Sequence, residues 1–258
     1  MEKKPQIQLK LEQVSYSEKI NAHTKYKLPE YPILQDISFE VYQGSRIAIT
    51  GPSGAGKSYL LRLLNRLSEP TNGKIYLENR EYRKIPTIEL RQSVILIGQE
   101  PKLLGMSVRE ALAYPLILRD LPKLQIQQRL SYWMEQLHIP DDWLGRTEAQ
   151  LSTGQRQLVN LARGLVIQPK ILLLDEPTSN LDVATTSYIT EILNQLYEKH
   201  QTTVLMVNHQ LNVAQMFCTR LLYLQQGRLM SNQTASQINW KNIQETLKQA
   251  EADDDFEF

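Results

Sequence analysis

The sequence predicts an α/β fold with a mainly parallel central sheet, an antiparallel β side sheet and an inserted α-helical subdomain. Four short, continuous apolar runs are typical of parallel strands buried on both faces: residues 47–49, 94–97, 171–174 and 204–207. Other segments alternate apolar and polar residues, as half-buried strands do. After residue 100 the pattern changes to longer helical spacing, which indicates the inserted helices.

The elements are expected in the following order. Residues 17–32 are polar and predict an extended loop. Alternation over residues 37–41 predicts a strand of the side sheet, and residues 75–77 predict another. Leucine spacing over residues 60–67 and 158–165 predicts helices that follow two glycine-bearing loops.

We expect a single domain over residues 1–235. Its core would consist of residues 1–100 and 155–235, and its helical subdomain of residues 101–154. Residues 236–258 are expected to form a C-terminal helix and an acidic tail, with disorder from Ala250 on.

Composition limits the class of protein. A chain of 258 residues with 41% hydrophobic residues can bury a sizeable core. A net charge of +1 gives no overall electrostatic case for a nucleic-acid partner. The single cysteine, Cys218, excludes an internal disulfide and fits a reducing compartment. The polar start and the shortness of the apolar runs predict a cytoplasmic protein without a signal sequence or membrane span.

The segment after the first apolar run matches the phosphate-loop pattern G-x-x-x-x-G-K-[ST]. It lies between a predicted strand and a predicted helix, which is the context that this motif requires; the alternative is an ordinary glycine turn. Glycines let backbone N–H groups turn toward phosphates, the lysine reaches the β and γ phosphates, and the serine hydroxyl binds Mg²⁺. The motif residues are Gly51, Pro52, Ser53, Gly54, Ala55, Gly56, Lys57 and Ser58.

Polar side chains follow the other three runs. Asp175 and Glu176 end the run 171–174, at the edge where α/β proteins bind ligands. His209 follows the run 204–207, so its imidazole could contact a γ-phosphate, and Gln99 follows the run 94–97. The alternatives are a solvated acidic turn and a structural histidine.

A second glycine-bearing loop, Leu151-Ser152-Thr153-Gly154-Gln155, precedes the second predicted helix, whose N-terminus can bind phosphate. This loop resembles the signature motif of ABC transporter ATP-binding subunits. The phosphate loop and the glutamine before it, and the acidic strand end and the histidine after it, stand in the order of that family. The resemblance runs from about Leu9 to about Met230 and includes the ABC ATPase fold.

The resemblance implies ATP and Mg²⁺ as bound groups and a role for each matching residue. Asp175 would orient Mg²⁺ through its water shell, and Gln99 would touch Mg²⁺ and link the core to the helical insert. Glu176 would be the general base that activates the attacking water, and His209 would contact the γ-phosphate. Tyr16 is the candidate for stacking on adenine, with Tyr26 and Tyr31 as competitors.

The signature residues Ser152, Gly154 and Gln155 imply a second ABC ATPase subunit, because in the family they close on ATP held by the opposite subunit. Two cassettes, expected here as a homodimer, would sandwich two nucleotides. Asp182 would carry communication across the dimer, although a helix cap is an equally simple interpretation.

Two positions depart from the family pattern. Tyr59 stands where a second hydroxyl residue such as threonine usually helps to hold the α-phosphate, so this nucleotide-contacting position bears on affinity. Thr153 stands where glycine is commoner, and its branched side chain restricts close approach to a phosphate.

The resemblance implies the ATPase subunit of a membrane transporter, peripheral on the cytoplasmic face of the cell membrane, with a separate multi-spanning membrane subunit and no nucleic acid. Residues 98–101, 104–105 and 114–116 resemble bacterial subunits assigned to putative iron or metal export. Alternatives are an importer subunit for phosphate or amino acids, a soluble ABC ATPase acting on nucleic acid or ribosomes, and a phosphate-loop kinase. The single cassette and short insert favour transport.

Overall fold

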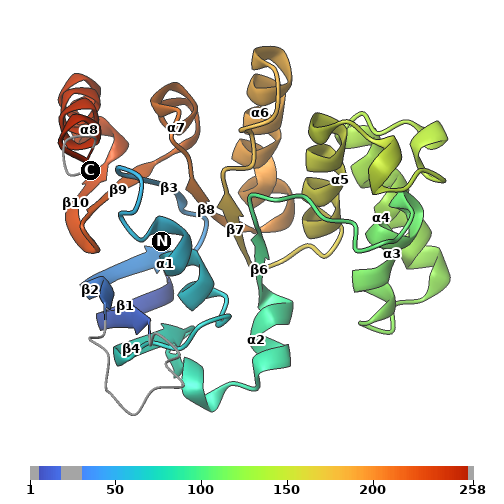
Figure 1. Ribbon diagram of the computed structural model, residues 1–258. Coiled ribbons are helices and arrows are strands. Elements are labelled where there is room, and N and C mark those ends of the chain that lie inside the picture. Colours follow the sequence, from blue (N-terminus) through green and yellow to red (C-terminus); the bar gives the residue numbers. More distant parts are fainter. Residues whose placement is uncertain (1–5, 19–30, 255–258) are drawn as a thin grey trace, which may run out of the picture.

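The computed structural model describes residues 6–18 and 31–254, which form two sheets and eight α-helices (Figure 1). The central sheet contains β3 (Arg46–Thr50), β6 (Val94–Ile97), β7 (Ile171–Asp175), β8 (Thr203–Val207), β9 (Arg220–Gln225) and β10 (Arg228–Thr234). Its order is β10-β9-β3-β8-β7-β6, with β10 antiparallel to β9 and the other neighbours parallel. The predicted, mainly parallel sheet is therefore confirmed.

The side sheet is antiparallel throughout, as predicted. It contains β1 (Ile7–Glu18), β2 (Tyr31–Tyr42), β4 (Asn72–Leu77) and β5 (Arg80–Glu81), in the order β2-β1-β4-β5. Between the two sheets lies α1 (Lys57–Leu64), whose four leucines are fully buried. They pack with one face of the central strands, for example with Ile47 and Leu173, in a single apolar cluster.

Helices cover the other face of the central sheet. Alternate strand residues, such as Leu172 and Leu174, point into this second apolar cluster. Because both faces are covered, the strand residues 47–49, 94–97, 171–174 and 204–207 are all apolar, which explains the continuous runs in the sequence. The helices beyond α1 are α2 (Thr87–Ser93), α3 (Val108–Ile117), α4 (Lys123–Gln136), α5 (Thr153–Leu165), α6 (Val183–His200), α7 (Leu211–Phe217) and α8 (Trp240–Asp254).

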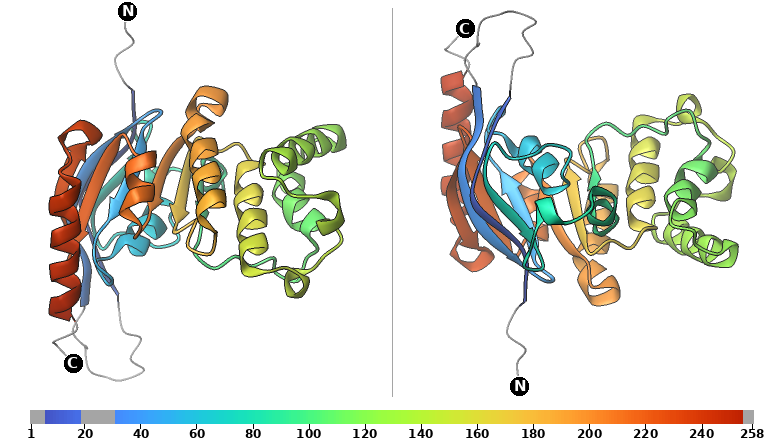
Figure 2. Two further views of the ribbon diagram at one scale, coloured as in Figure 1. Left: turned by 90° about the horizontal axis from the view of Figure 1, so that it is seen from above. Right: turned by 90° about the horizontal axis from the view of Figure 1, so that it is seen from below.

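The helical insert lies at the opposite end of the molecule from α8 (Figure 2). Its helices α3 and α4 pack on α5 around Trp133, which is 2% exposed. Two short 3-10 turns, η2 (Asp141–Trp143) and η3 (Glu148–Gln150), link α4 to α5, while η1 (Tyr82–Lys84) precedes α2 and η4 (Ala235–Gln237) precedes α8. The extra helices thus lie beyond β6, beside the strand end that carries Gln99.

Three sequence-based predictions were wrong. Part of the expected loop over residues 17–32 is strand, because the β1–β2 ladder continues to the pair Glu18 and Tyr31; residues 19–30 lie outside the described part. The expected disorder from Ala250 is contradicted by α8, which continues to Asp254 and is anchored by apolar residues spaced three to four apart. Leu67, expected in a helix, is 54% exposed, because α1 ends at Leu64 and Arg66 adopts a φ of 57°.

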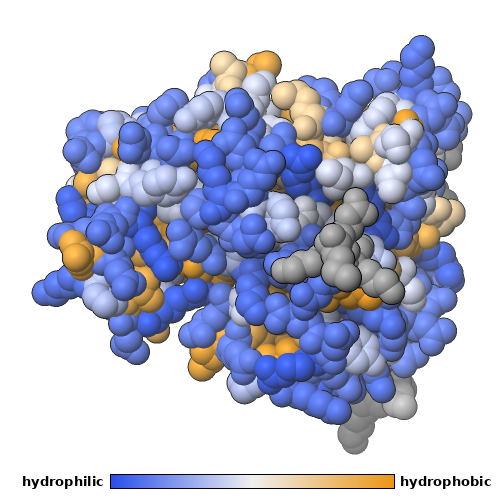
Figure 3. Space-filling view, turned by 180° about the vertical axis from the view of Figure 1, so that it is seen from behind, coloured by the Kyte–Doolittle hydropathy of each residue, from blue (hydrophilic) through white to orange (hydrophobic). Residues whose placement is uncertain are grey.

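The surface seen from behind is mainly hydrophilic, with apolar side chains in separate patches (Figure 3). Among the described residues, every helix is too short or too polar to cross a membrane.

Candidate functional site

The phosphate loop connects β3 to α1 in a conformation that glycine permits. Gly51 and Gly56 have φ angles of 150° and 91°. A Cβ on Gly51 would lie 1.9 Å from the carbonyl oxygen of Leu224, and one on Gly56 would lie 2.9 Å from that of Ile33. The loop therefore runs against β9 and β2 at distances that side chains would prevent.

The loop is built to receive an anion. Lys57 is 6% exposed, and its Nζ donates to the carbonyl oxygens of Gly51 and Pro52 at 2.7 and 2.6 Å. Gly56 is the N-cap of α1, so in the described chain no side chain caps that helix. Its first-turn N–H groups and the positive end of the helix dipole are thus directed at the loop, which fits the phosphates of a nucleotide.

The acidic end of β7 lies beside this loop. Burial raises the pKa of the Asp175 carboxyl, and the interaction with the Ser58 hydroxyl offsets part of this rise. The Glu176 N–H donates to the Val207 carbonyl at 3.0 Å, and Glu176 adopts a φ of 50°, so the chain turns sharply after the strand. Asp175 pairs with Val207 in the sheet, which brings the ends of β7 and β8 together.

The Glu176 carboxylate, at the end of β7, contacts side chains at the ends of β6 and β8. Glu176 Oε1 lies 2.8 Å from Nε2 of His209, and its Oε2 accepts from Nε2 of Gln99 at 3.2 Å. The Glu176 side chain is 18% exposed and that of His209 is 45% exposed. The three residues predicted from the ends of β6, β7 and β8 are therefore in direct contact, and the carboxylate is oriented from both sides.

These groups line one cavity of about 760 Å³. It also contains residues that the sequence analysis missed, from β2 and from the turn between β9 and β10. The backbone explains their approach, because the Gln35 N–H donates to the Gly227 carbonyl at 2.8 Å. The lining residues are Pro32, Ile33, Gln35, Ser53, Gly54, Ala55, Gly56, Lys57, Ser58, Tyr59, Gln99, Glu176, His209, Gln226 and Gly227.

Tyr59 contributes an aromatic ring to this cavity. Its hydroxyl donates to Glu18 at 3.0 Å, its ring lies 5.5 Å from that of Tyr16, and the Arg62 guanidinium lies 5.2 Å from its centroid. Tyr16 packs behind Tyr59 and is not among the described residues that line the cavity. Tyr26 and the side chain of Tyr31 lie outside the described part of the chain.

The signature segment begins α5. Ser152 is the N-cap and accepts from the Gln155 N–H at 3.2 Å, while Gln155 Oε1 accepts from the Ser152 N–H at 2.9 Å. Gly154 faces the next loop, where its Cβ would lie 3.1 Å from the Asn180 carbonyl. In the described part of the chain, residues 151–157 contribute nothing to the lining of the phosphate-loop cavity. The chain thus does not bring its signature to its own phosphate loop.

Asp182, the other residue predicted at a dimer contact, is the N-cap of α6. Its carboxylate accepts from the Thr185 N–H at 2.8 Å and from the Thr185 hydroxyl at 2.7 Å. The hydrogen bond from the Thr185 N–H is the largest of the effects that lower the pKa of Asp182. The helix cap that the sequence left as an alternative is present.

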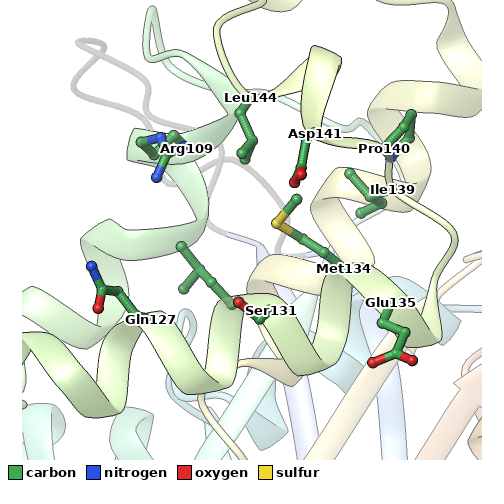
Figure 4. Close-up of a pocket in the computed structure, with 10 residues that line it drawn as sticks. Arg109, Gln127, Ser131, Met134, Glu135, Ile139, Pro140, Asp141 and Leu144 are labelled. Carbon is green, nitrogen blue, oxygen red and sulfur yellow. The ribbon is translucent and has the colours of Figure 1, made fainter.

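A separate cavity of about 480 Å³ lies in the helical insert, between α4 and η2 (Figure 4). The side chains of Leu144 and Asp141 extend toward Met134 on α4. Among the described residues that line it, none belongs to the predicted site.

A glycine loop between a parallel strand and a helix, with a buried lysine and a second parallel strand of the same sheet that ends in two carboxylates, defines a phosphate-loop nucleotide-binding protein. Residues 34–179 match the family model described as ABC transporter, and the chain belongs to that family. It is an ATP-binding cassette of the family, as the signature segment predicted.

Curated relatives agree with this assignment. The chain is 34% identical over 242 residues to methionine import ATP-binding protein MetN 2 of Pseudomonas syringae pv. tomato, covering 91% of this chain and 72% of that protein. It is 33% identical to glutamine transport ATP-binding protein GlnQ of Geobacillus stearothermophilus, covering 78% and 84%. It spans only 58% to 72% of the length of the methionine-import relatives. The expected likeness to iron or metal export subunits is not supported by these import and transport proteins.

Solved structures confirm the predicted ABC ATPase fold. The ATP-binding cassette MJ0796, in a dimeric, post-hydrolysis state bound to ADP and Pi, is 28% identical with a TM-score of 0.79, covering 88% of this chain and 98% of that one. CbiO1 of Clostridium perfringens, part of the ABC transporter complex cbiONQ, shares the fold at 24% identity, with a TM-score of 0.76 and coverage of 95% and 94%.

Proposed function

We propose that this chain is the ATP-hydrolysing subunit of an ABC importer whose cargo belongs to the amino-acid class. The observation that carries the proposed hydrolysis is the Glu176 carboxylate, which lies in the phosphate-loop cavity between His209 and Gln99. Import of an amino acid is favoured by relatives named for methionine import and glutamine transport.

In this proposal the phosphate loop holds the nucleotide. The backbone N–H groups of residues 53–58 and the ammonium of Lys57 bind the phosphates, and the close packing of Gly51 and Gly56 against β9 and β2 holds the loop in this conformation. Tyr59 contributes a ring at the cavity wall, and Tyr16 remains the ring predicted to stack on adenine.

Ser58, Asp175 and Gln99 are proposed to hold Mg²⁺, Asp175 through the water shell of the ion. A hydroxyl, a carboxylate and an amide oxygen form the hard oxygen set that this ion prefers, and Ser58 and Asp175 are in hydrogen-bond contact. When bound, Mg²⁺ would neutralise charge on the phosphate oxygens. Burial raises the pKa of Asp175, and a bound cation beside it would favour the ionised carboxylate.

Glu176 is the proposed general base. His209 and Gln99 hold both of its oxygens, so the carboxylate has one orientation from which to accept a proton from an attacking water. Proton acceptance by a positioned side chain contributes about 100- to 10,000-fold to a rate.

A second copy of the chain is proposed to complete each site. Ser152, Gly154 and Gln155 lie on the N-terminal turn of α5, which presents its own anion-binding end away from the phosphate loop of the same chain. Opposed copies would place this turn against the other copy's nucleotide. A separate multi-spanning membrane subunit would form the pathway, with this chain on its cytoplasmic face.

The proposal is tested by expressing Glu176→Gln in the native cell, holding it with ATP and Mg²⁺, solubilising the membranes gently, and identifying what co-purifies by mass spectrometry. A multi-spanning membrane protein is the expected partner, and Lys57→Ala, which should not bind ATP, is the matched control. Recovery of only ribosomal, nucleic-acid or soluble partners would replace transport by the soluble class of ABC ATPase. If the wild-type chain hydrolyses no ATP, the proposed ATPase activity is refuted.

A further inference from the structure

The segment that carries Gln99 is held by side chains. After β6 ends at Ile97, residues 98–103 cross from the central sheet to the helical insert. Three of the backbone groups in this segment are bonded to side chains: the carbonyls of Gly98 and Lys102 and the N–H of Leu103. The position of Gln99, and with it the hydrogen bond from Gln99 to Glu176, depends on those side chains.

Two of the holding residues lie on one face of α5. Asn160, which is 5% exposed, donates to the Gly98 carbonyl at 3.4 Å. Arg163 donates to the Lys102 carbonyl at 2.8 Å through one nitrogen and to the Asn160 side-chain oxygen at 2.7 Å through another. Because residues three apart are neighbours on a helix, the pair forms one clamp over the start and end of the segment.

The third contact leads to the same helix. Glu148 in η3 accepts from the Leu103 N–H at 2.9 Å, and its other oxygen lies 3.5 Å from Arg156 of α5. Arg156 in turn donates to Thr153 in the first turn of α5. All three holding points of the segment are therefore bonded to α5 or to a partner of α5.

The same helix starts at the signature. Ser152 and Gln155 cap α5, and Asn160 lies eight residues further along, a rise of about 12 Å. The helix also approaches β6 closely, because a Cβ on Gly164 would lie 2.4 Å from Cδ1 of Ile97. A displacement of the capped end is thus carried by a rigid element to the place where Gln99 is held.

We propose that Asn160 and Arg163 are positioning residues for Gln99: they clamp residues 98–103 to α5, so that the signature end of this helix and the Gln99–Glu176 hydrogen bond move as one unit. The clamp is a property of the folded chain, and its effect on hydrolysis rests on the proposed function. A movement of the signature residues on binding nucleotide would be transmitted through α5 and Gln99 to the proposed general base, Glu176.

The test replaces Arg163 by methionine, which keeps the length of the side chain and removes its donors. Arg119→Met is the matched control, because Arg119 is also half-buried and donates to two carbonyls, those of Gln92 and Ile167, away from the segment. Hydrogen exchange followed by mass spectrometry on the nucleotide-free chain is expected to speed up about 10- to 100-fold over residues 98–105 in Arg163→Met alone, the equivalent of one lost charged hydrogen bond. Unchanged exchange in this segment would overturn the clamp.

A kinetic cycle tests the link to Gln99. Arg163→Met should lower kcat for ATP hydrolysis about 10- to 100-fold with KM for ATP unchanged, Arg163→Lys should recover part of the loss, and Gln99→Ala with Arg163→Met should be no slower than Gln99→Ala alone. If the kcat losses of the two single variants multiply in the double variant, Arg163 does not act through Gln99. If the wild-type chain hydrolyses no ATP, the proposed function fails, and the exchange measurement alone decides the clamp. Should Arg163→Met not fold, Asn160→Ala gives the same two readouts.

Discussion

Replacing Gly51 by alanine measures how closely the phosphate loop is pressed against β9. The new Cβ would lie 1.9 Å from the Leu224 carbonyl oxygen, whereas ordinary contact begins at 3.4 Å. Strand or loop would have to shift by about 1.5 Å, the difference of the two distances. Gly54→Ala is the matched control in the same loop, since among the described residues no heavy atom lies within 4 Å of its added Cβ.

The two substitutions distinguish the cost of backbone strain from the cost of a steric clash between the new Cβ and its neighbours. At Gly54, with a φ of 72°, alanine pays only for a left-handed backbone, about 1–2 kcal/mol. At Gly51, with a φ of 150°, backbone strain costs about 1–3 kcal/mol, and the forced shift of packed atoms adds about 1–3 kcal/mol. Gly51→Ala should therefore lower the free energy of unfolding by about 2–6 kcal/mol, a large part of the stability of an ordinary domain.

Urea unfolding of the nucleotide-free chain is the assay, because bound nucleotide would add stability of its own. The midpoint of Gly51→Ala should lie well below that of Gly54→Ala, at a similar slope. Equal midpoints, or a greater loss in Gly54→Ala, would refute the packing of the loop against Leu224.

Three further predictions concern residues in and beside the phosphate-loop cavity. Glu176→Gln should bind ATP normally and hydrolyse it about 100- to 10,000-fold more slowly, as measured by equilibrium binding and phosphate release; a near-normal rate would remove Glu176 from the role of general base. Asp175→Asn should raise the melting temperature of the nucleotide-free chain at neutral pH, because burial raises the pKa of Asp175 and so disfavours its charged form in the folded state. That gain should shrink as the pH falls through the raised pKa toward the ordinary aspartate range, so calorimetry showing the same gain at every pH would contradict the burial argument. Tyr59→Ala removes the ring against which Tyr16, the proposed adenine-stacking residue, packs, so it should weaken ATP binding about tenfold while leaving inorganic triphosphate binding unchanged. Tyr114→Ala on α3 should change neither, and equal losses for both ligands in Tyr59→Ala would show that this pair of rings does not contact the nucleoside.

The central strands could be predicted because strands buried on both faces have continuous runs of apolar residues in the sequence. Every residue of the run 171–174 is fully buried, so the run is apolar throughout. By contrast β10 alternates exposed and half-buried residues, including Ser231 and Gln233, and pairs with β9 at the edge of the sheet. Its strand conformation comes from that neighbour, and the polar sequence Arg228–Thr234 has no comparable apolar signal.

The site shows the same division. Lys57, Gln99 and Glu176 were predictable because each follows an apolar strand at a fixed offset, and parallel strand ends meet at one edge. Pro32 and Gln226 line the same cavity but come from β2 and the β9–β10 turn, which are joined only by tertiary pairing. The Gln99 segment is similar, since its contacts with Asn160 and Arg163 span about sixty residues of sequence, more than any local pattern covers.

The pairing of Asp175 with Val207 has a consequence for which changes of chain length the protein can tolerate. His209 reaches Glu176 only while β8 keeps its register against β7, and one residue inserted in β8 would turn every following side chain to the opposite face. An insertion in the turn after α6, where Gln201 already adopts a φ of 57°, would be absorbed before the ladder begins at Thr203. Near β8, an insertion compatible with the site is thus expected in the turn before the strand, and β8 itself must keep its length.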